Sequence, residues 1–205
     1  MNYQEHIKTY DALADEYESR IEKLIPVTKH AIEQFAMYLK PNGSILELGC
    51  GVGLATKLFS EKDFKVIGID LSPKMLRYAK ARNPHAAYIE GDFLTTDFDS
   101  TFDGIFGFAF IHLFSKDDAQ KVLNKIRNLL NTGGFIYLGT TRALESKEGW
   151  EVKQDYSGKY LRFRKHWTKL EFTEALISSK LKILKSFVYE DPFGKLWMDF
   201  IAKKS

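Results

Sequence analysis

The fold follows from residues 45–53, Ile-Leu-Glu-Leu-Gly-Cys-Gly-Val-Gly, where an apolar run leads into three alternating glycines. We predict a buried strand that turns through the glycines into a helix over residues 54–59. Glycines at these positions permit a tight turn and let a ligand lie against bare peptide groups. The same pattern also fits a strand-to-helix turn that binds nothing, so a ligand site needs support from other residues.

Short apolar runs alternate with helical patterns along the rest of the chain. Strand-like runs occupy residues 44–48, 65–70, 86–90, 102–108 and 134–140. The layout predicts an α/β fold, a doubly wound, mostly parallel seven-stranded sheet with helices on both faces. Two further runs, 182–190 and 195–202, flank the turn sequence Asp191-Pro192-Phe193-Gly194 and predict a C-terminal antiparallel hairpin that closes the sheet.

Helix boundaries are marked by capping and breaking residues. Ser72 precedes a proline, and Ser115 and Thr168 are each followed three residues later by an acid, so each is a predicted N-cap. The helix that begins near Ala119 is expected to end at Thr132-Gly133-Gly134. Residues 4–39 predict two helices, broken near Pro26.

The length favours one domain, residues 1–205. We divide it into an N-terminal helical segment (1–40), a core (44–141), an insertion (142–167), and a helix with the closing hairpin (168–205).

The composition restricts the function classes. Thirty basic residues against 27 acidic leave a net charge of +3, which argues against a general nucleic-acid binder. Cys50 is the single cysteine, so an internal disulfide or a cysteine zinc site is excluded and a reducing compartment is favoured. The polar start predicts no signal peptide, and no apolar run reaches the roughly 20 residues of a membrane span. We expect a soluble cytoplasmic protein.

Two acids follow the second and third predicted strands. Asp70 lies 17 residues after Gly53 (70 − 53), and Asp92 follows residues 86–90. Because the carboxyl ends of adjacent parallel strands meet in one crevice, Asp70 could accept hydrogen bonds from both hydroxyls of a ribose, and Asp92 from an adenine amine with Phe93 against the ring. A nicotinamide dinucleotide is disfavoured because its pyrophosphate requires G-x-G-x-x-G, whereas the spacing here is G-x-G-x-G.

These residues resemble the class I methyltransferases that use S-adenosylmethionine. Glu47-x-Gly49-x-Gly51-x-Gly53 is similar to their first motif, and the run Asp70-Leu71-Ser72-Pro73-Lys74-Met75 is similar to their acid, serine and methionine pattern. The N-terminal segment 10–17 resembles the lid over the cofactor. The resemblance implies that residues 1–40 are a helical lid, 44–141 the cofactor-binding core and 142–167 an acceptor-side insertion. The resemblance implies S-adenosyl-L-methionine as cofactor and S-adenosyl-L-homocysteine as product. It implies these cofactor-binding residues: Tyr10, Tyr17, Glu47, Gly49, Cys50, Gly51, Gly53, Asp70, Leu71, Met75, Gly91, Asp92, Phe93 and Phe108.

Several of these residues keep a second interpretation. Glu47 either steadies the methionine portion of the cofactor or accepts hydrogen bonds from nearby backbone amides. Tyr10 and Tyr17 share a helical face and are either lid residues or core aromatics. Phe108 either lines the pocket or packs in the core. Cys50 lies in the glycine loop, where we expect it to pack and not to act as a nucleophile.

The fourth strand is expected to continue through residues 107–113 beside the transferring methyl group. It lacks the tetrad of Asn or Asp, two prolines and an aromatic found in exocyclic-amine methylases of nucleic acids. His112 is the candidate catalytic residue, as a general base, with closure of a local hydrogen-bond network as the alternative.

Residues 150–167 interleave aromatic and basic side chains. They suit nucleic acid, a small acidic or aromatic acceptor held under a roof, or a β-ribbon with inward aromatics and outward cations. We favour the small acceptor, with Tyr160, Arg162, Arg164 and His166 as substrate-binding residues.

The leading hypothesis is a methyltransferase that transfers a methyl group to a small molecule by in-line displacement and requires no metal. Methylation of RNA or protein, or a non-catalytic S-adenosylmethionine-binding module, are the alternatives. Nucleic acid and a membrane are not expected partners, and the oligomeric state stays open.

Overall fold

The computed structural model describes residues 3–153 and 156–205. Met1 and Asn2 of the predicted lid, and Gln154 and Asp155 of the predicted insertion, lie outside the described residues. Within the described residues the strands, in chain order, are β1 (Ser44–Leu48), β2 (Lys65–Asp70), β3 (Ala87–Glu90), β4 (Phe102–Phe108), β5 (Leu130–Thr141), β6 (Lys147–Lys153), β7 (Tyr160–His166), β8 (Leu181–Glu190) and β9 (Leu196–Lys204). The helices are α1 (Tyr3–Ser19), α2 (Ile21–Ala36), α3 (Leu54–Ser60), α4 (Pro73–Arg82), α5 (Lys116–Leu129), α6 (Lys169–Ser178) and the short 3₁₀ helix η1 (Ile111–Leu113).

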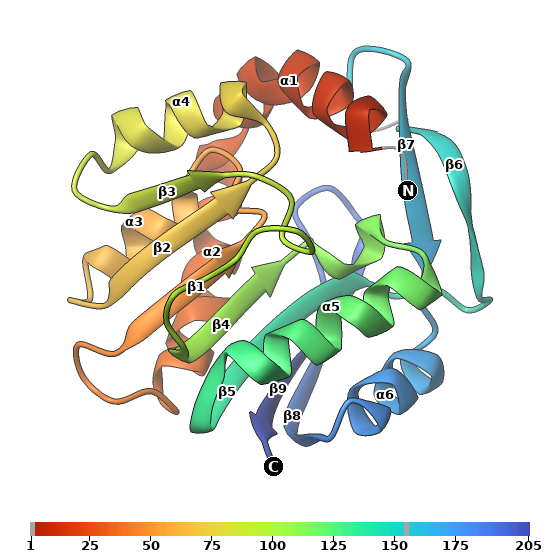
Figure 1. Cartoon of the computed structure of the whole chain (residues 1–205). Helices are drawn as coiled ribbons and strands as arrows, with labels where there is room; N and C mark the ends of the chain where they lie inside the picture. Colours follow the sequence, from red (N-terminus) through yellow and green to blue (C-terminus); the bar gives the residue numbers. More distant parts are fainter. Residues whose placement is uncertain (1–2, 154–155) are drawn as a thin grey trace.

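Seven strands form one sheet in the order β3-β2-β1-β4-β5-β9-β8 (Figure 1). The first five are parallel, and β9 joins β5 antiparallel and pairs with β8 as a hairpin. The predicted doubly wound, mostly parallel sheet with its closing hairpin is confirmed. The order reverses between β1 and β4, and in such a sheet a ligand crevice opens at that point, beyond the carboxyl ends of the strands.

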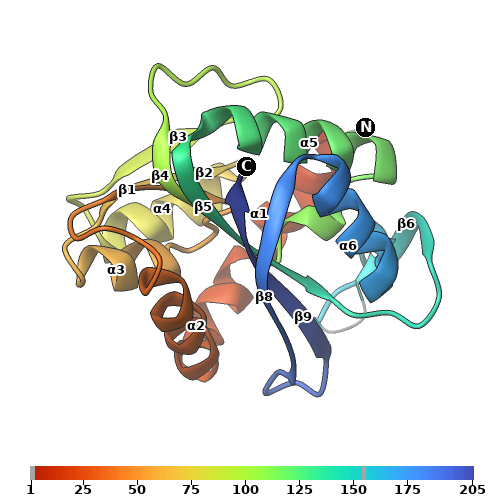
Figure 2. The ribbon, with the colours of Figure 1, turned by 90° about the horizontal axis from the view of Figure 1, so that it is seen from below.

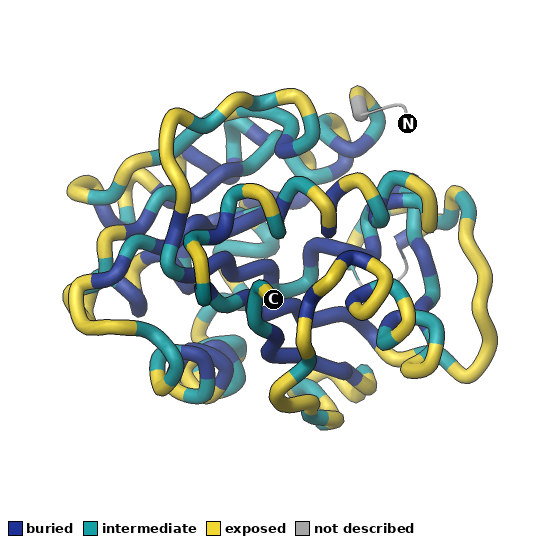
Figure 3. Tube along the Cα trace, turned by 60° about the horizontal axis from the view of Figure 1, so that its bottom comes forward, coloured by how far each residue is buried: buried dark blue, intermediate teal, exposed yellow. Residues whose placement is uncertain are grey.

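Helices cover both faces of the sheet, as predicted (Figure 2). On one face α2 and α3 bury an aromatic-rich cluster that includes Phe35, Phe59 and Phe106. On the other, α5 and α6 bury a larger aliphatic cluster that includes Leu123 and Ile126 with Leu46 and Ile105 of the sheet. The central strands are mostly dark in Figure 3, and many of the exposed stretches lie in loops. Burial on both faces explains why these strands read as continuous apolar runs.

The three predicted N-caps are present. The side chains of Ser72, Ser115 and Thr168 each accept a hydrogen bond from the backbone N–H three residues on, at the starts of α4, α5 and α6. Each bond satisfies one of the otherwise unpaired amides of a helix N-terminus.

Two predicted boundaries were wrong. The N-terminal helices separate at Arg20, and Pro26 lies inside α2. Pro26 occupies the second turn of that helix, so it removes only one of the early intrahelical hydrogen bonds. In addition, α5 ends at Leu129 and β5 begins at Leu130, before the glycines that were expected to end the helix. A register shift between Phe102 and Gly104 lets Leu130 pair with Phe102, and Gly133 lies inside the strand with φ +75°.

Residues 147–166 form a β-ribbon, which was one of the interpretations of residues 150–167. Strands β6 and β7 pair antiparallel from Lys147 opposite His166 to Lys153 opposite Tyr160. Residues that are directly opposite each other share a face of such a pair. We call β6 and β7 together the ribbon. It stands beside the N-terminal part of α1, at the edge of the molecule (Figure 1).

The glycine loop supports a stability prediction, because Gly53 and Gly51 are constrained differently. Gly53 has φ +78°, and a Cβ there would lie 2.8 Å from Cα and Cβ of Ala79, whereas Gly51 has φ +52° and open space around it. We expect Gly53→Ala to lower the free energy of unfolding by about 3 kcal/mol, from backbone strain and overpacking, and Gly51→Ala by about 1 kcal/mol, from strain alone. Urea denaturation of both variants would test this, and equal losses would contradict the assignment.

Candidate functional site

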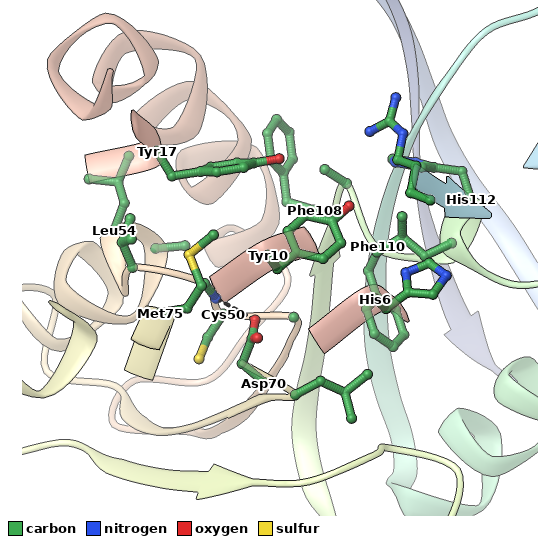
Figure 4. Close-up of a pocket in the computed structure, with 18 of the residues that line it drawn as sticks. His6, Tyr10, Tyr17, Cys50, Leu54, Asp70, Met75, Phe108, Phe110 and His112 are labelled. Atoms are coloured by element: carbon green, nitrogen blue, oxygen red, sulfur yellow. Dashed lines mark hydrogen bonds between the residues drawn. The ribbon is translucent and has the colours of Figure 1, made fainter. Parts of the chain in front are cut away.

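A cavity of about 260 Å³ lies at the carboxyl ends of the parallel strands, beneath α1. It is lined by the glycine loop after β1, the residues that follow β2, β3 and β4, one side of α1, and the ribbon. Figure 4 shows Tyr10 between Asp70, Cys50 and Met75 on one side and Phe110, His6 and His112 on the other. Most of the predicted site residues line this cavity: Tyr10, Tyr17, Glu47, Gly49, Cys50, Gly51, Asp70, Leu71, Met75, Gly91, Asp92, Phe93, Phe108, His112, Arg162 and Arg164. Three do not: Gly53, Tyr160 and His166.

Each of the three glycines of the loop is needed for a different structural reason. All three have positive φ, and a Cβ at Gly49 would lie 2.9 Å from the Phe110 ring. Gly53 allows α3 and α4 to approach each other closely. A Cβ at Gly51 would meet no other atom within 4 Å, so the bare backbone of this residue faces the open cavity. The loop therefore presents an unobstructed peptide surface at residue 51.

Asp70 is held by the backbone around it. One carboxylate oxygen accepts a hydrogen bond from the Gly51 N–H at 2.8 Å, and the other from the Ser72 N–H at 2.9 Å. Burial raises the pKa of Asp70, and these amide donors partly offset the effect. Each oxygen keeps acceptor capacity for a ligand hydroxyl.

Glu47 is buried behind the glycine loop. Its carboxylate accepts a hydrogen bond from the Thr56 hydroxyl, and burial raises its pKa to about 8. Cys50 is also buried, and a Cβ at Gly68 would lie 2.9 Å from its sulfur. Burial raises the pKa of Cys50 well above its usual value, which keeps the sulfur a thiol and agrees with the expected packing role.

Asp92 and Phe93 occupy the loop after β3. Asp92 Oδ1 accepts a hydrogen bond from the Leu94 N–H at 3.0 Å. Phe93 is buried and meets Phe110 edge to face, with ring centroids 6.1 Å apart. The carboxyl of Asp92 and the ring of Phe93 thus border the same cavity as Asp70.

Helix α1 crosses the cavity and is attached on both sides. Towards α4, Asp11 accepts hydrogen bonds from the Ser72 hydroxyl and the Lys74 N–H, and Asp15 pairs with Lys74 at 2.8 Å. Towards the ribbon, the Thr9 hydroxyl donates to the Leu161 carbonyl at 2.6 Å. Tyr10 and Tyr17 project from α1 into the cavity, so they are partly exposed lining residues and not members of the main core.

The segment after β4 differs from the prediction. The strand ends at Phe108, because Ala109 adopts φ +59° and turns the chain into η1. His112 lies on η1, buried, with Nδ1 3.3 Å from the Thr140 hydroxyl oxygen. Burial and then the nearby cations, Arg164 first, hold the pKa of His112 well below its usual value. The imidazole is therefore neutral at physiological pH.

The ribbon has the opposite orientation to the β-ribbon considered from sequence. Its cavity face carries Lys153, Arg162 and Arg164, while Trp150, Val152 and Leu161 are exposed on its other face. Tyr160 and His166 share the parity of the two arginines but lie at the ends of β7, beyond the cavity. His166 Nε2 lies 2.8 Å from a Glu151 oxygen.

Other lining residues were missed from sequence. Phe110 belongs to the segment that was expected to be a strand, and Trp197 belongs to the hairpin that was expected only to close the sheet. His6 lies N-terminal to the segment compared with the lid. Lys153 could have been found, because it stands opposite residue 160 once β6 and β7 are paired.

Comparisons with known proteins agree with this geometry. Residues 45–134 match a family model described as a methyltransferase domain. An uncharacterized methyltransferase of Alkaliphilus oremlandii is 37% identical over 110 residues, 53% of this chain and 50% of that protein. Carboxy-S-adenosyl-L-methionine synthase of Klebsiella pneumoniae is 26% identical over 199 residues, 89% of this chain and 77% of that protein.

The matched residues, 45–134, include the glycine loop, Asp70 and Asp92. The fold of the whole chain agrees: the 1,6-didemethyltoxoflavin-N1-methyltransferase of Burkholderia thailandensis superposes with a TM-score of 0.73 at 18% identity, covering 94% of this chain and 87% of that one. That structure contains 1,6-didemethyltoxoflavin and S-adenosylhomocysteine. The match to the Alkaliphilus protein covers about half of that relative's length.

Two features are absent from the described part of the chain. Over residues 3–153 and 156–205, no helix is long and apolar enough to cross a bilayer. Within the same residues, no three His, Cys, Asp or Glu side chains are grouped so that they could hold a metal ion.

The buried Glu47 predicts a pH dependence of stability. Its folded pKa of about 8 lies above its ordinary value of 4.5. Its protonation therefore contributes stability that is fully present below pH 4.5 and is lost as the pH rises through about 8. Glu47→Gln keeps an oxygen that can accept from Thr56 but removes this titration. We expect the melting temperature of the variant to fall less between pH 5 and pH 8 than that of the unmodified chain, by several degrees. The exposed Glu61→Gln is the control, and parallel curves for Glu47→Gln would contradict the buried, protonated state.

Proposed function

We propose that this chain is an S-adenosylmethionine-dependent methyltransferase that acts on a small molecule. The proposal rests on one observation: a single covered cavity joins the glycine loop and Asp70 at one end to aromatic and cationic side chains at the other. A donor bound at the first end would face an acceptor at the second. The buried, unpaired Cys50 is consistent with a cytoplasmic location, which we include in the proposal.

The residues present fit the cofactor. The bare backbone at Gly51 leaves room for a ligand, and Asp70 is fixed so that its oxygens can accept from ribose hydroxyls. Leu71, Met75, Asp92 and Phe93 would surround the adenine. Tyr10, Tyr17 and Glu47, with the peptide groups of residues 49–51, would hold the methionine portion.

When bound, the cofactor supplies an electrophilic methyl group on a sulfonium. In the transfer, a lone pair of the acceptor forms the new bond to carbon, the carbon–sulfur pair stays on sulfur to give S-adenosylhomocysteine, and an acceptor proton goes to a base or to water. The contribution of the chain is to orient the acceptor in line and to exclude water. Helix α1 performs the second task, because it closes the cavity and is hydrogen-bonded on both sides.

His112 is neutral and could accept the acceptor's proton. The same burial and cations that keep it neutral also make it a weak base. This favours an acceptor atom that needs little deprotonation in the transition state, such as a neutral amine, a ring nitrogen or a thiol.

A small acceptor is favoured over RNA because cationic side chains of the ribbon point into the cavity and not to the surface. An RNA surface requires cations that are exposed to the backbone phosphates. Lys153 and Arg162 are instead buried, at 3% and 4% exposure, and they line the cavity. The outer face of the ribbon exposes Trp150, Val152 and Leu161.

A second candidate is synthesis of a carboxylated form of S-adenosylmethionine, as the name of the Klebsiella relative describes. Two observations favour it: the alignment covers 89% of this chain, and cations border the cavity where a carboxylate could be held.

The direct test is incubation of the full chain with labelled S-adenosylmethionine and a fractionated cell extract. We expect label in the small-molecule fraction, together with S-adenosylhomocysteine. Label in RNA or protein would reject the small-molecule proposal. A carboxylated nucleoside identified by mass spectrometry would establish the second candidate, and an unchanged cofactor in every fraction would favour a non-catalytic binding module.

Cofactor binding is tested separately at Asp70. We expect Asp70→Ala to weaken S-adenosylmethionine binding by about 2 kcal/mol, roughly 30-fold, through loss of charge-assisted hydrogen bonds. Asp70→Asn keeps an oxygen that can accept from the loop amides, so we expect it to lose less of the binding free energy than Asp70→Ala. Titration calorimetry gives both values, with the exposed Asp99→Ala as a matched control. An unchanged affinity for both Asp70 variants would remove this residue from the site.

A further inference from the structure

Three cations of the ribbon are concentrated on one wall of the cavity. Lys153 is the last residue of β6, and Arg162 and Arg164 lie two residues apart on β7. All three side chains lie on the face of the ribbon that is turned to the cavity. Arg20, after α1, and Lys195, before β9, line the same cavity. Five cationic side chains therefore border a space of about 260 Å³.

The carboxylates near this wall are already engaged. Glu151 shares its oxygens among Arg162 at 3.6 Å, Arg164 at 3.5 Å and His166 at 2.8 Å. Asp191 accepts from the Trp197 indole at 2.8 Å and from backbone amides of its own turn. Arg20 pairs with Glu16. These cations have partners within the chain, and they still line the cavity.

Burial and the charges of these cations lower the pKa values of two nearby histidines. Burial and then the charge of Arg162 lower the pKa of His6 to about 4. The pKa of His112 is lowered by burial and then by Arg164, Arg162, Lys153 and Lys195, in that order. The two histidines enter from α1 and from η1, so the positive potential extends across this half of the cavity.

Aromatic rings adjoin the cationic wall. Phe108 and Trp197 stack in parallel, with centroids 5.5 Å apart and planes within 7°. Figure 4 places Phe108, Phe110 and His112 on the side of the cavity away from Met75. A flat apolar body could lie against these rings while a charged group on it reaches the ribbon.

We propose that the methyl acceptor is a small planar molecule that carries an oxyanion, a carboxylate or a phosphate, and that Lys153, Arg162 and Arg164 bind this group. The inference rests on the proposed function, because it assigns the acceptor half of the same cavity. Guanidinium groups suit this task, since they present paired N–H donors to a carboxylate or phosphate. The oxyanion orients the acceptor, and the aromatic rings hold its body near the donor end.

The experiment uses benzoate, phenyl phosphate and the uncharged benzamide as probes. S-adenosylhomocysteine binding to the full chain is measured first by calorimetry, and this titration alone tests the donor half of the site. Each probe is then titrated into the chain, saturated with S-adenosylhomocysteine if it binds and free if it does not. We expect at least one of the two anions to bind about tenfold or more tightly than benzamide, and the stronger one identifies the oxyanion class.

Variants then locate the anion site. Arg164→Gln and Lys153→Gln should each reduce the preference for the anion over benzamide to near unity, with S-adenosylhomocysteine affinity unchanged within twofold. Lys147→Gln removes an exposed cation of the same ribbon outside the cavity and should keep the full preference. Circular dichroism checks that each variant is folded.

Three results would overturn the proposal. The first is anion binding no tighter than benzamide binding in the unmodified chain, which includes no detectable binding of any probe, and this needs no variant to fold. The second is an anion preference that persists in both cavity variants. The third is labelled product formed from an extract whose anions have been removed by anion exchange at pH 8. None of these results depends on loss of S-adenosylhomocysteine binding, so failure of the anion site is distinguishable from failure of the proposed function.

Discussion

The carboxylate of Asp70 ties together the elements that form the donor end of the cavity. By accepting from the amides of Gly51 and Ser72, it links the loop after β1 to the start of α4. The constraint is electrostatic as well as geometric: a buried carboxylate is costly unless donors surround it, and these donors come from backbone that must curve around it. The shape of the glycine loop and the position of the acid are therefore one arrangement, held by hydrogen bonds of the chain itself.

The covering helix depends on the same corner of the molecule. Asp11 of α1 reaches the Ser72 hydroxyl and the Lys74 amide at the N-terminus of α4, where an anion is favoured by the helix dipole and by unpaired amides. At its other side, α1 is joined to the ribbon through Thr9 and Leu161. The helix therefore connects the two sides of the cavity through hydrogen bonds.

For a physical reason, sequence alone grouped the residues at the glycine-loop end of the cavity more completely than those at the ribbon end. Parallel strands bring their carboxyl ends to one edge, so Gly51, Asp70 and Asp92 could be placed together from strand order alone. The ribbon offered no such rule: its residues alternate between two faces, and periodicity cannot say which face turns inward. The two-residue spacing of Arg162 and Arg164 predicted that they share a face. It could not predict where the cavity ends, and Tyr160 and His166 lie beyond it. Similarly, Ala109 turns the chain in a left-handed backbone conformation, which an alanine in the sequence does not predict.

The charges divide the cavity in a way that bears on the chemistry. Carboxylates gather where a sulfonium donor would bind, and cations gather where an acceptor would lie, so each end favours a ligand of opposite sign. The cationic wall also lowers the basicity of His112, and strong anion binding and strong general-base catalysis are therefore in conflict at this site. In this arrangement, alignment of the acceptor and exclusion of water would contribute most to a methyl transfer, and proton abstraction would contribute least. The electrostatics thus make orientation of the acceptor, through the ribbon, the main source of any rate enhancement.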